Sequence, residues 1–256
     1  METRRFRLTV AYDGTAYCGW QVQPQVRTIE GELNRCLSEL TGEEIQVIGA
    51  SRTDTGVHAL GNIAVFDSTT RIPAEKLPYA INQRLPEDIR VQKGEWVPDA
   101  FHPRHCASRK TYEYRIYSAP FPLPTVRLYS YFTYHQLELE PMQKAAALLL
   151  GEHDFTSFCS AKTEKENKVR TLYEGTVQQE GKFFLFRVTG NGFLYNMVRI
   201  LAGTLLQMGQ GSLQPEQIPA ILAAKDRKKA GPTLPPEGLT LRKIQYESEE
   251  DCLLER

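Results

Sequence analysis

One carboxylate in this chain lies in a short polar stretch, from Ser51 to Gly56, whose residue types suit a reactive turn. Arg52 places a permanent cation two residues from Asp54, and a neighbouring cation lowers the pKa of a carboxylate by about 1–3 units. Gly56 has no Cβ, so a ligand can approach the backbone closely there. Asp54 is therefore a candidate nucleophile. The structural alternative is an Asx-turn closed by a local ion pair.

Several sequence blocks together carry a resemblance to one enzyme family. The R-T-D-x-G-V-H-A sequence that starts at Arg52 resembles the active-site signature of the tRNA pseudouridine synthases of the TruA type. Ser51 departs from the Gly that many members have at this position. The match runs from about Arg5 to Tyr246 in the family's order. Its other blocks are Tyr12 to Thr15 with Gly19 to Gln23, Gly151 to Phe158, Asn191 to Arg199, and Gly231 to Leu239.

The resemblance implies an isomerase that converts uridines 38, 39 and 40 of the tRNA anticodon stem-loop to pseudouridine. This reaction detaches uracil at its N1–C1′ bond, rotates it and reattaches it through C5. Nothing is gained or lost overall, so neither an organic cofactor nor a metal ion is expected. The expected partners are tRNA, bound through its anticodon arm, and a second copy of the chain, because the family works as a homodimer.

Four residues receive roles from the resemblance. Asp54 matches the catalytic Asp, and the sequence leaves open whether it attacks C6 of uracil, attacks C1′ or helps to form a glycal. Tyr112 matches the Tyr whose ring stacks on the target base, which is worth about 1–3 kcal/mol, and whose hydroxyl is a candidate acceptor of the C5 proton; the alternative is a cross-strand aromatic. Arg199 matches the Arg that pairs with the catalytic Asp, or else it is a charge on the polar edge of a helix. Arg52 is the candidate for entering the RNA stack when the base leaves it, or it forms a turn ion pair with Asp54.

Hydrophobic periodicity predicts the order β-α-β-β-α-β in the first part of the chain, which is a ferredoxin-like unit. Apolar residues alternate from Phe6 to Tyr12, as in a half-buried strand. From Ile29 to Leu40 they recur at helical spacing after Thr28, a candidate N-cap. The remaining elements are expected as strands at 45–48 and 62–66, a short helix at 74–84 and a strand at 89–96.

The second part repeats this order, with one additional helix. Strands are expected at 112–117, 169–177, 183–188 and 240–246, and helices at 142–150, 194–208 and 216–224. The predicted fold class is α+β: two ferredoxin-like (βαββαβ) halves, whose antiparallel sheets join around a central cleft in the family. We place the N-terminal half at 1–104, the C-terminal half at 105–246 and an acidic tail at 247–256.

The formal net charge of the chain is zero, but the charges are unevenly distributed, so an RNA partner is still compatible with the sequence. Residues 247–256 carry five acids and one base, so residues 1–246 hold 30 bases against 26 acids. Basic clusters on one side of a protein form a track for nucleic acid, although each cluster alone is usually a solvated surface. The clusters are Arg4 to Arg7, Arg104 to Lys110, Lys162 to Arg170 and Lys225 to Lys229; the segment 162–170 is either an arm that closes on RNA or a linker.

Other function classes receive less support. No apolar run approaches the roughly 18 residues of a membrane span, and no signal peptide is evident, so a cytoplasmic protein is expected. The five cysteines lie far apart without a C-x-x-C, which is typical of reduced thiols. His102, His105 and Cys106 lack a second cluster that would complete a metal site. An RNA-binding module without turnover, such as a tRNA folding chaperone, has no need of Asp54, and a glycoside hydrolase requires a second acid near it.

Overall fold

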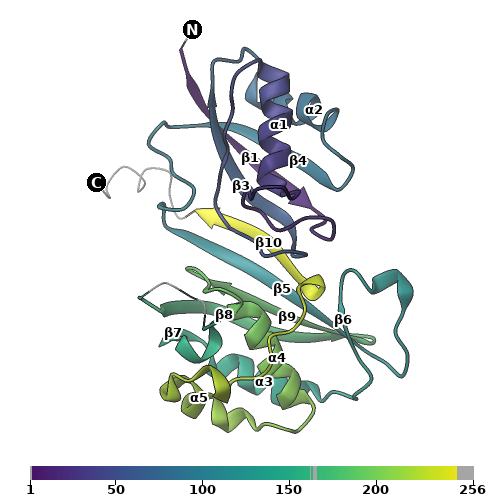
Figure 1. Cartoon of the computed structure of the whole chain (residues 1–256). Helices are drawn as coiled ribbons and strands as arrows, with labels where there is room; N and C mark the ends of the chain where they lie inside the picture. Colours follow the sequence, from purple (N-terminus) through teal and green to yellow (C-terminus); the bar gives the residue numbers. More distant parts are fainter. Residues whose placement is uncertain (1, 162, 164–165, 247–256) are drawn as a thin grey trace. The chain divides into compact units, whose positions relative to one another are not determined.

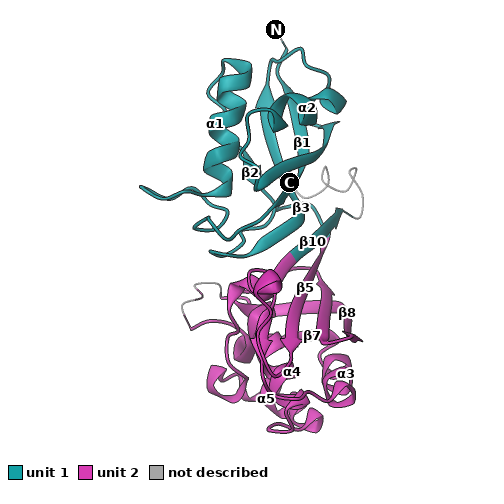
Figure 2. Ribbon diagram, turned by 90° about the vertical axis from the view of Figure 1, so that its right-hand side faces the viewer, with its two compact units in different colours: residues 1–108, 241–256 teal, residues 109–240 magenta. Residues whose placement is uncertain are grey.

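The computed structural model describes residues 2–161, 163 and 166–246 (Figure 1). The chain divides into two compact units: unit 1 comprises residues 1–108 and the chain from Leu241 onward, and unit 2 comprises residues 109–240 (Figure 2). The boundary predicted at Arg104 stays a prediction, because this division follows Ser108 and assigns most of the last strand to unit 1. The acidic tail at 247–256 lies outside the described residues.

Unit 1 is an antiparallel sheet with two helices on one face (Figures 1 and 2). The strand order is β4-β1-β3; β2 pairs with β3 opposite Val65 and Ala64, and β10 also neighbours β3. Apart from β10, which was predicted as the last strand of the second part, its elements follow the predicted order β-α-β-β-α-β. They are β1 (Arg4–Tyr12), α1 (Ile29–Thr41), β2 (Ile48–Gly49), β3 (His58–Ser68), α2 (Leu77–Asn82), β4 (Ile89–Val97) and β10 (Leu239–Tyr246).

Helix α1 confirms the prediction made from its periodicity and its cap. The Thr28 hydroxyl accepts a hydrogen bond from the Gly31 amide at 3.2 Å, which satisfies one of the free N–H groups at the start of the helix. Gly42 follows the last turn with φ 73°, a left-handed conformation that glycine adopts without a Cβ penalty. Ile29, Leu33, Cys36 and Leu37 of the apolar stripe are fully buried, and Leu40 is half-buried.

The main strands of unit 2 pair antiparallel in the order β5-β9-β8-β7. The short strand β6 runs parallel to β5, and α3 packs against both β8 and α4. Its elements are β5 (Ser108–Ser118), β6 (Tyr131–Thr133), α3 (Leu139–Leu148), β7 (Gly151–Asp154), β8 (Val169–Glu180), β9 (Phe183–Gly190), α4 (Met197–Gly209) and α5 (Ile218–Ala224).

Short 3-10 turns connect several of these elements. They are η1 (Ala74–Lys76), η2 (Pro124–Val126), η3 (Thr156–Phe158), η4 (Pro215–Gln217), η5 (Arg227–Lys229) and η6 (Pro236–Gly238). The described part of the chain thus contains five α-helices and extensive antiparallel pairing, which confirms the predicted α+β class.

Some element boundaries differ from the predictions for identifiable reasons. The strand expected at 45–48 is only Ile48–Gly49, because the Ile45 amide donates to Ser38 Oγ at 2.9 Å and the Val47 amide to Asn34 Oδ1 at 2.8 Å. Side chains of α1 therefore replace a neighbouring strand as partners of this backbone. The helix expected from residue 194 begins at Met197, because Asn196 has a left-handed backbone with φ 62°. Strands β6 and β7 were not predicted.

Candidate active site

The Asp54 turn lies between β2 and β3 in unit 1. Ser51 and Thr53 are buried, Arg52 is exposed, and the Asp54 side chain is half-buried. The Val57 amide donates to the Asp54 carbonyl oxygen at 3.1 Å and closes the turn. Alternate side chains thus anchor the turn in unit 1, whereas Arg52 points to the surface.

A loop at residues 13–20 packs directly against this turn. The Trp20 amide donates to the Thr53 carbonyl oxygen at 3.0 Å. A Cβ on Gly19 would lie 2.6 Å from that same oxygen, so only glycine permits this approach. A Cβ on Gly14 would lie 2.1 Å from the Val57 carbonyl oxygen. The N-terminal sequence block of the resemblance therefore provides the surface on which the Asp54 turn rests.

His58, which is buried at the start of β3, contacts the same loop. Its Nδ1 lies 3.1 Å from the Gly14 amide nitrogen and 3.2 Å from Asp13 Oδ1. Asp13 Oδ1 also accepts hydrogen bonds from the amide and the hydroxyl of Thr15, at 3.0 and 2.6 Å. These contacts hold the backbone on the C-terminal side of the turn.

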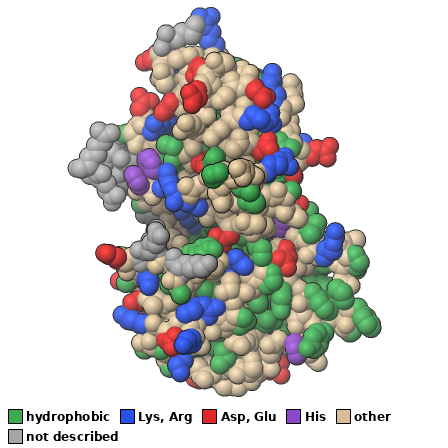
Figure 3. Space-filling view, viewed as in Figure 1, with side chains coloured by type: hydrophobic (Ala, Val, Ile, Leu, Met, Phe, Trp, Pro, Cys, Tyr) green, Lys and Arg blue, Asp and Glu red, His purple; other side chains and the backbone are tan. Residues whose placement is uncertain are grey.

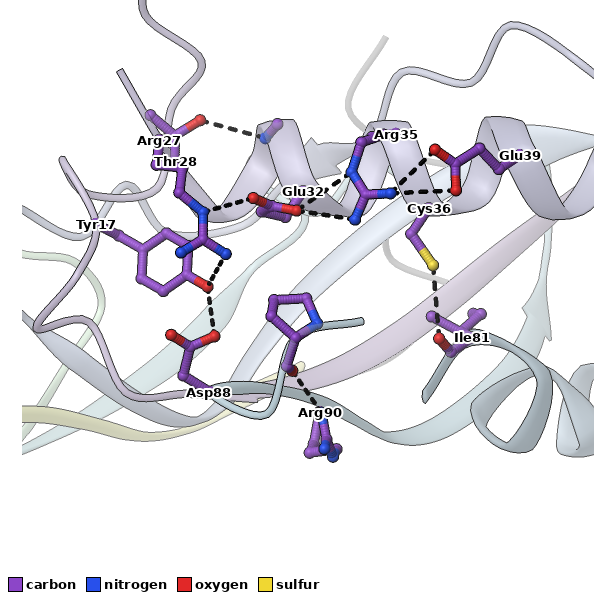
Figure 4. Close-up of polar contacts among 12 residues, drawn as sticks. Tyr17, Arg27, Thr28, Glu32, Arg35, Cys36, Glu39, Ile81, Asp88 and Arg90 are labelled. Carbon is purple, nitrogen blue, oxygen red and sulfur yellow. Dashed lines mark hydrogen bonds and ion pairs between the residues drawn. The ribbon is translucent and has the colours of Figure 1, made fainter. Parts of the chain in front are cut away.

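A chain of polar contacts connects the loop to α1 and to the turn before β4 (Figure 4). The Tyr17 hydroxyl donates to the Asp88 carboxylate, and Arg27 donates to the Tyr17 oxygen at 3.2 Å and to Glu32 at 2.7 Å. Burial and the bond to Asp88 raise the pKa of Tyr17, so its hydroxyl stays a donor. Burial also acts to raise the pKa of Glu32, but hydrogen bonds from Arg27 and Arg35 outweigh it and lower that pKa. Glu32 is therefore held ionised.

Tyr112 occupies the middle of β5 in unit 2. Its side chain is buried, and its ring meets that of Phe193 edge to face, with centroids 5.2 Å apart and an interplanar angle of 82°. Val188 on β9 is its cross-strand partner. Two residues further on, Tyr114 is fully buried, and its hydroxyl donates to the Pro235 carbonyl oxygen at 2.7 Å.

Arg199 lies in the first turn of α4 and contacts both the N-cap residue of this helix and the segment 231–234. Its guanidinium donates to Asn196 Oδ1 at 2.8 Å and to the Leu234 carbonyl oxygen at 2.6 Å. The Gly231 amide donates to Thr204 Oγ1 at 2.9 Å. A Cβ on Gly203 would lie 1.9 Å from the Pro232 carbonyl oxygen, so the segment 231–234 lies directly on α4. Arg199 therefore orders this segment as well as carrying a charge.

The predicted site residues thus fall in two groups, one in each unit. Arg52 and Asp54 share one turn in unit 1, and Tyr112 and Arg199 belong to β5 and α4 of unit 2. Their catalytic roles stay predictions. Sequence reasoning missed the contributions of Gly14 and Gly19, although two glycines within a block of aromatic and polar residues are a signal of close backbone approach.

The His102 to Cys106 segment does not have the features of a metal centre. Cys18, Cys36 and Cys159 are free. The rings of His102 and His105 stack with centroids 3.8 Å apart. Among the residues that the structure describes, no group of three or more His, Cys, Asp or Glu side chains is placed to hold a metal ion.

Basic side chains of the predicted RNA track have mixed roles. Lys225 forms an ion pair with Asp154 at 2.8 Å, and Arg227 donates to the Gly231 carbonyl oxygen at 2.8 Å, whereas Lys228 and Lys229 are exposed. On the face shown in Figure 3, lysines and arginines are interspersed with acidic side chains. Lys162 and Lys165 of the predicted arm lie outside the described residues, and Arg170 donates to the carbonyl oxygens of Asn167 and Val169.

Within the described ranges, no helix has the length and apolar character needed to span a bilayer.

Comparison with known proteins gives a consistent result across almost the whole chain. The sequence model of the family described as tRNA pseudouridine synthase matches residues 8–105 and 145–247. The chain is 47% identical over 243 residues to tRNA pseudouridine synthase A of Thermoanaerobacter sp. (strain X514), covering 95% of this chain and 100% of that protein. It is 45% identical over 246 residues to tRNA pseudouridine synthase A of Bacillus subtilis (strain 168), with the same coverage. The chain is also 45% identical over 243 residues to tRNA pseudouridine synthase A of Caldicellulosiruptor bescii, and the match covers 95% of this chain and 100% of that protein. The chain therefore belongs to the tRNA pseudouridine synthase family and is an isomerase that acts on tRNA.

Proposed function

We propose that this protein isomerises uridines 38, 39 and 40 in the anticodon stem-loop of tRNA, with Asp54 as the catalytic carboxylate. The observation that carries the proposal is the built turn around Asp54. Its backbone is held by the Trp20 amide on one side and by the Val57 amide on the other, and glycine at position 19 is needed for the approach. A carboxylate held in this way is positioned for chemistry, because pre-organised geometry removes part of the entropic cost of reaction.

The other roles follow the family resemblance and fit the surroundings of each side chain. Tyr112 stacks on the extruded uracil, supported on its edge by Phe193. Arg199 pairs with the catalytic carboxylate and is oriented for this by Asn196 and Leu234. Arg52, which is exposed, enters the RNA stack when the base leaves it. No metal or organic cofactor takes part in the proposed reaction.

The proposed fold is a pair of ferredoxin-like halves. In unit 1, β1 pairs antiparallel with both β3 and β4, and β2 pairs antiparallel with β3, which supports the split βαβ arrangement. In unit 2, the neighbouring order β5-β9-β8 provides the same support. We also propose that the enzyme works in the cytoplasm as a homodimer that binds the anticodon arm, as in the family it resembles.

Mapping the modified positions tests this function. A tRNA transcript with uridine at 38, 39 and 40 is incubated with the enzyme, treated with a carbodiimide that marks pseudouridine, and read by primer extension. A stop directly on the 3′ side of each of these positions is expected, and each stop should vanish when cytidine replaces that uridine. Tight binding without any stop would instead favour an RNA-binding module that has lost turnover.

A further inference from the structure

A buried polar network lies beneath the Asp54 turn, entirely within unit 1. The hydroxyl of Tyr12, at the end of β1, lies 2.8 Å from Thr53 Oγ1. Asn62 Nδ2, on β3, donates to the same Tyr12 oxygen at 3.2 Å. Tyr12 and Thr53 are buried, and Asn62 is 0% exposed. The Tyr12 hydroxyl therefore joins two strands of the sheet to the residue that precedes Asp54.

Asn62 extends this network to the other side of Arg52. Its Nδ2 donates to the Ser51 carbonyl oxygen at 2.9 Å, and its Oδ1 accepts from the amides of Ser51 and Ile63 at 3.3 and 2.9 Å. The backbone at Ser51 is thus held through both of its polar groups. Together with the Thr53 contact, this fixes the chain immediately before and after Arg52.

The position of these groups in the sheet is unusual for their residue types. Asn is depleted in strands, and a buried amide costs free energy unless it is hydrogen-bonded. Pairing of β1 with β3 shifts register between Val10 and Tyr12, so Tyr12 lies opposite Ala59. Such irregularities redirect side chains and are frequent beside active sites. Here the redirected Tyr12 ring also packs on Trp20, with centroids 5.9 Å apart.

We propose that Tyr12 is a positioning residue, whose hydroxyl, held by Asn62, sets the backbone of the Asp54 turn for catalysis through Thr53. This inference rests on the proposed function, because it requires Asp54 to be the catalytic carboxylate. The hydroxyl does not touch the substrate in this account. It acts by limiting the displacement of the turn, and a displacement of about 1 Å at a reacting group can reduce a rate about 100-fold.

The test uses variants that remove single hydroxyl groups from the full-length enzyme. Tyr12→Phe keeps the ring against Trp20, and Thr53→Val keeps the shape of the side chain. Each should lower kcat by about 10- to 100-fold while KM for tRNA changes by less than about threefold. Thr53→Ser restores the hydroxyl and should recover kcat to within about threefold of the parent.

A double variant separates shared from independent roles. Tyr12→Phe and Thr53→Val remove the same hydrogen bond, so combining them should reduce kcat no further than the more severe single change, within about threefold. If the two losses multiply, the residues act independently and the proposal is wrong.

Tyr246→Phe is the matched control for general destabilisation. Its hydroxyl donates to the Pro103 carbonyl oxygen at 2.9 Å, so the variant loses one partly buried tyrosine hydrogen bond of the same unit. Its kcat should stay within about threefold of the parent. An equal loss of kcat in Tyr246→Phe and Tyr12→Phe would reduce the network to ordinary structural support and overturn the proposal.

Hydrogen exchange provides a second readout that does not depend on turnover. The Trp20 amide, which donates to Thr53, should exchange at least about tenfold faster in Tyr12→Phe than in Tyr246→Phe. Equal exchange in the two variants would contradict a role for Tyr12 in holding the turn. Asp54→Asn is assayed in parallel: if it retains parent activity, the catalytic role of Asp54 fails, whereas normal activity of Tyr12→Phe beside an inactive Asp54→Asn overturns the present inference alone.

Discussion

Arg199 and Leu234 hold each other through two hydrogen bonds of opposite direction. The Arg199 Nε donates to the Leu234 carbonyl oxygen at 2.6 Å, and the Leu234 amide donates to the Arg199 carbonyl oxygen at 3.3 Å. The side chain proposed to pair with the catalytic carboxylate is therefore also a structural link between α4 and the segment 231–234.

Arg199→Lys tests whether a positive charge alone is sufficient for pairing with the catalytic carboxylate and for linking α4 to the segment 231–234. Lysine keeps the positive charge but has no planar fork with which to reach Asn196 and Leu234 together. We expect a loss of about 1–3 kcal/mol in the free energy of unfolding and a fall of at least about tenfold in kcat. Urea unfolding and tritium release from tRNA labelled at uracil C5 measure the two effects.

Arg227→Lys is the matched control for the structural part. Arg227 donates to the Ala230 and Gly231 carbonyl oxygens, so it orders the same segment without a proposed role in chemistry. It should lose comparable stability and keep kcat within about threefold of the parent. Equal losses of kcat in both variants would argue that Arg199 acts only by ordering the segment.

Tyr112 has two proposed functions that one pair of variants can distinguish. Tyr112→Phe keeps the ring beside Phe193 but removes the hydroxyl, whereas Tyr112→Ala removes both. If the hydroxyl accepts the C5 proton, Tyr112→Phe should bind tRNA normally and form little product; if stacking dominates, it should remain active. Tyr112→Ala should weaken the complex by about 1–3 kcal/mol. Filter binding and tritium release are the measurements, and an equal loss of binding in both variants would contradict either role.

The charge network of Tyr17, Arg27 and Glu32 predicts a pH dependence for stability. The pKa of Glu32 is lowered below its ordinary value of 4.5 in the folded protein. Its contribution is therefore fully present above pH 4.5 and is lost as the pH falls through the lower folded value. Glu32→Gln should make the decline in unfolding free energy below pH 4.5 shallower than in the parent. Urea unfolding followed by tryptophan fluorescence measures this, and Glu87→Gln, at an exposed position, is the control. Parallel curves for the parent and Glu32→Gln would refute the coupling.

Salt dependence tests the part of the predicted RNA track that the structure describes. Lys228 and Lys229 are exposed beside the ordered Arg227, so they are available to phosphate groups. Replacing both with Ala should flatten the slope of log affinity against log salt by about 1–2 units if both contact tRNA phosphates. Lys144→Ala, at an exposed helical position paired with Glu140, should leave the slope unchanged. An unchanged slope in the double variant would exclude these two lysines from the track.

Elements whose conformation depends on residues adjacent in the sequence could be predicted from local sequence signals. The Thr28 cap and apolar spacing predicted α1, and the loop around Asp54 with its Gly56 was recognised as a turn; Gly56 indeed has φ 79°. The strand at 45–48 was overestimated because its backbone partners, Ser38 and Asn34, come from the preceding helix. Propensity carries no information about such tertiary partners.

The hydrogen bonds among Tyr12, Thr53 and Asn62 beneath the Asp54 turn could not be predicted from the sequence, because they too are tertiary contacts. Tyr12 and Asn62 are 50 residues apart, and their contact depends on the register shift near the end of β1. Asn62 in an apolar strand was nevertheless a signal, since a buried amide requires a partner. The roles of Asp54, Tyr112, Arg52 and Arg199 stay predictions that activity measurements must test.

Tritium release from tRNA labelled at uracil C5, compared between the parent enzyme and Asp54→Asn, shows whether Asp54 is the catalytic carboxylate. Asparagine keeps the shape of the carboxylate and removes its charge and nucleophilicity, so tRNA affinity measured by filter binding should change little. We expect the parent to release tritium and Asp54→Asn to release none above background. Activity of Asp54→Asn within about tenfold of the parent would contradict the assignment of Asp54 as the catalytic carboxylate.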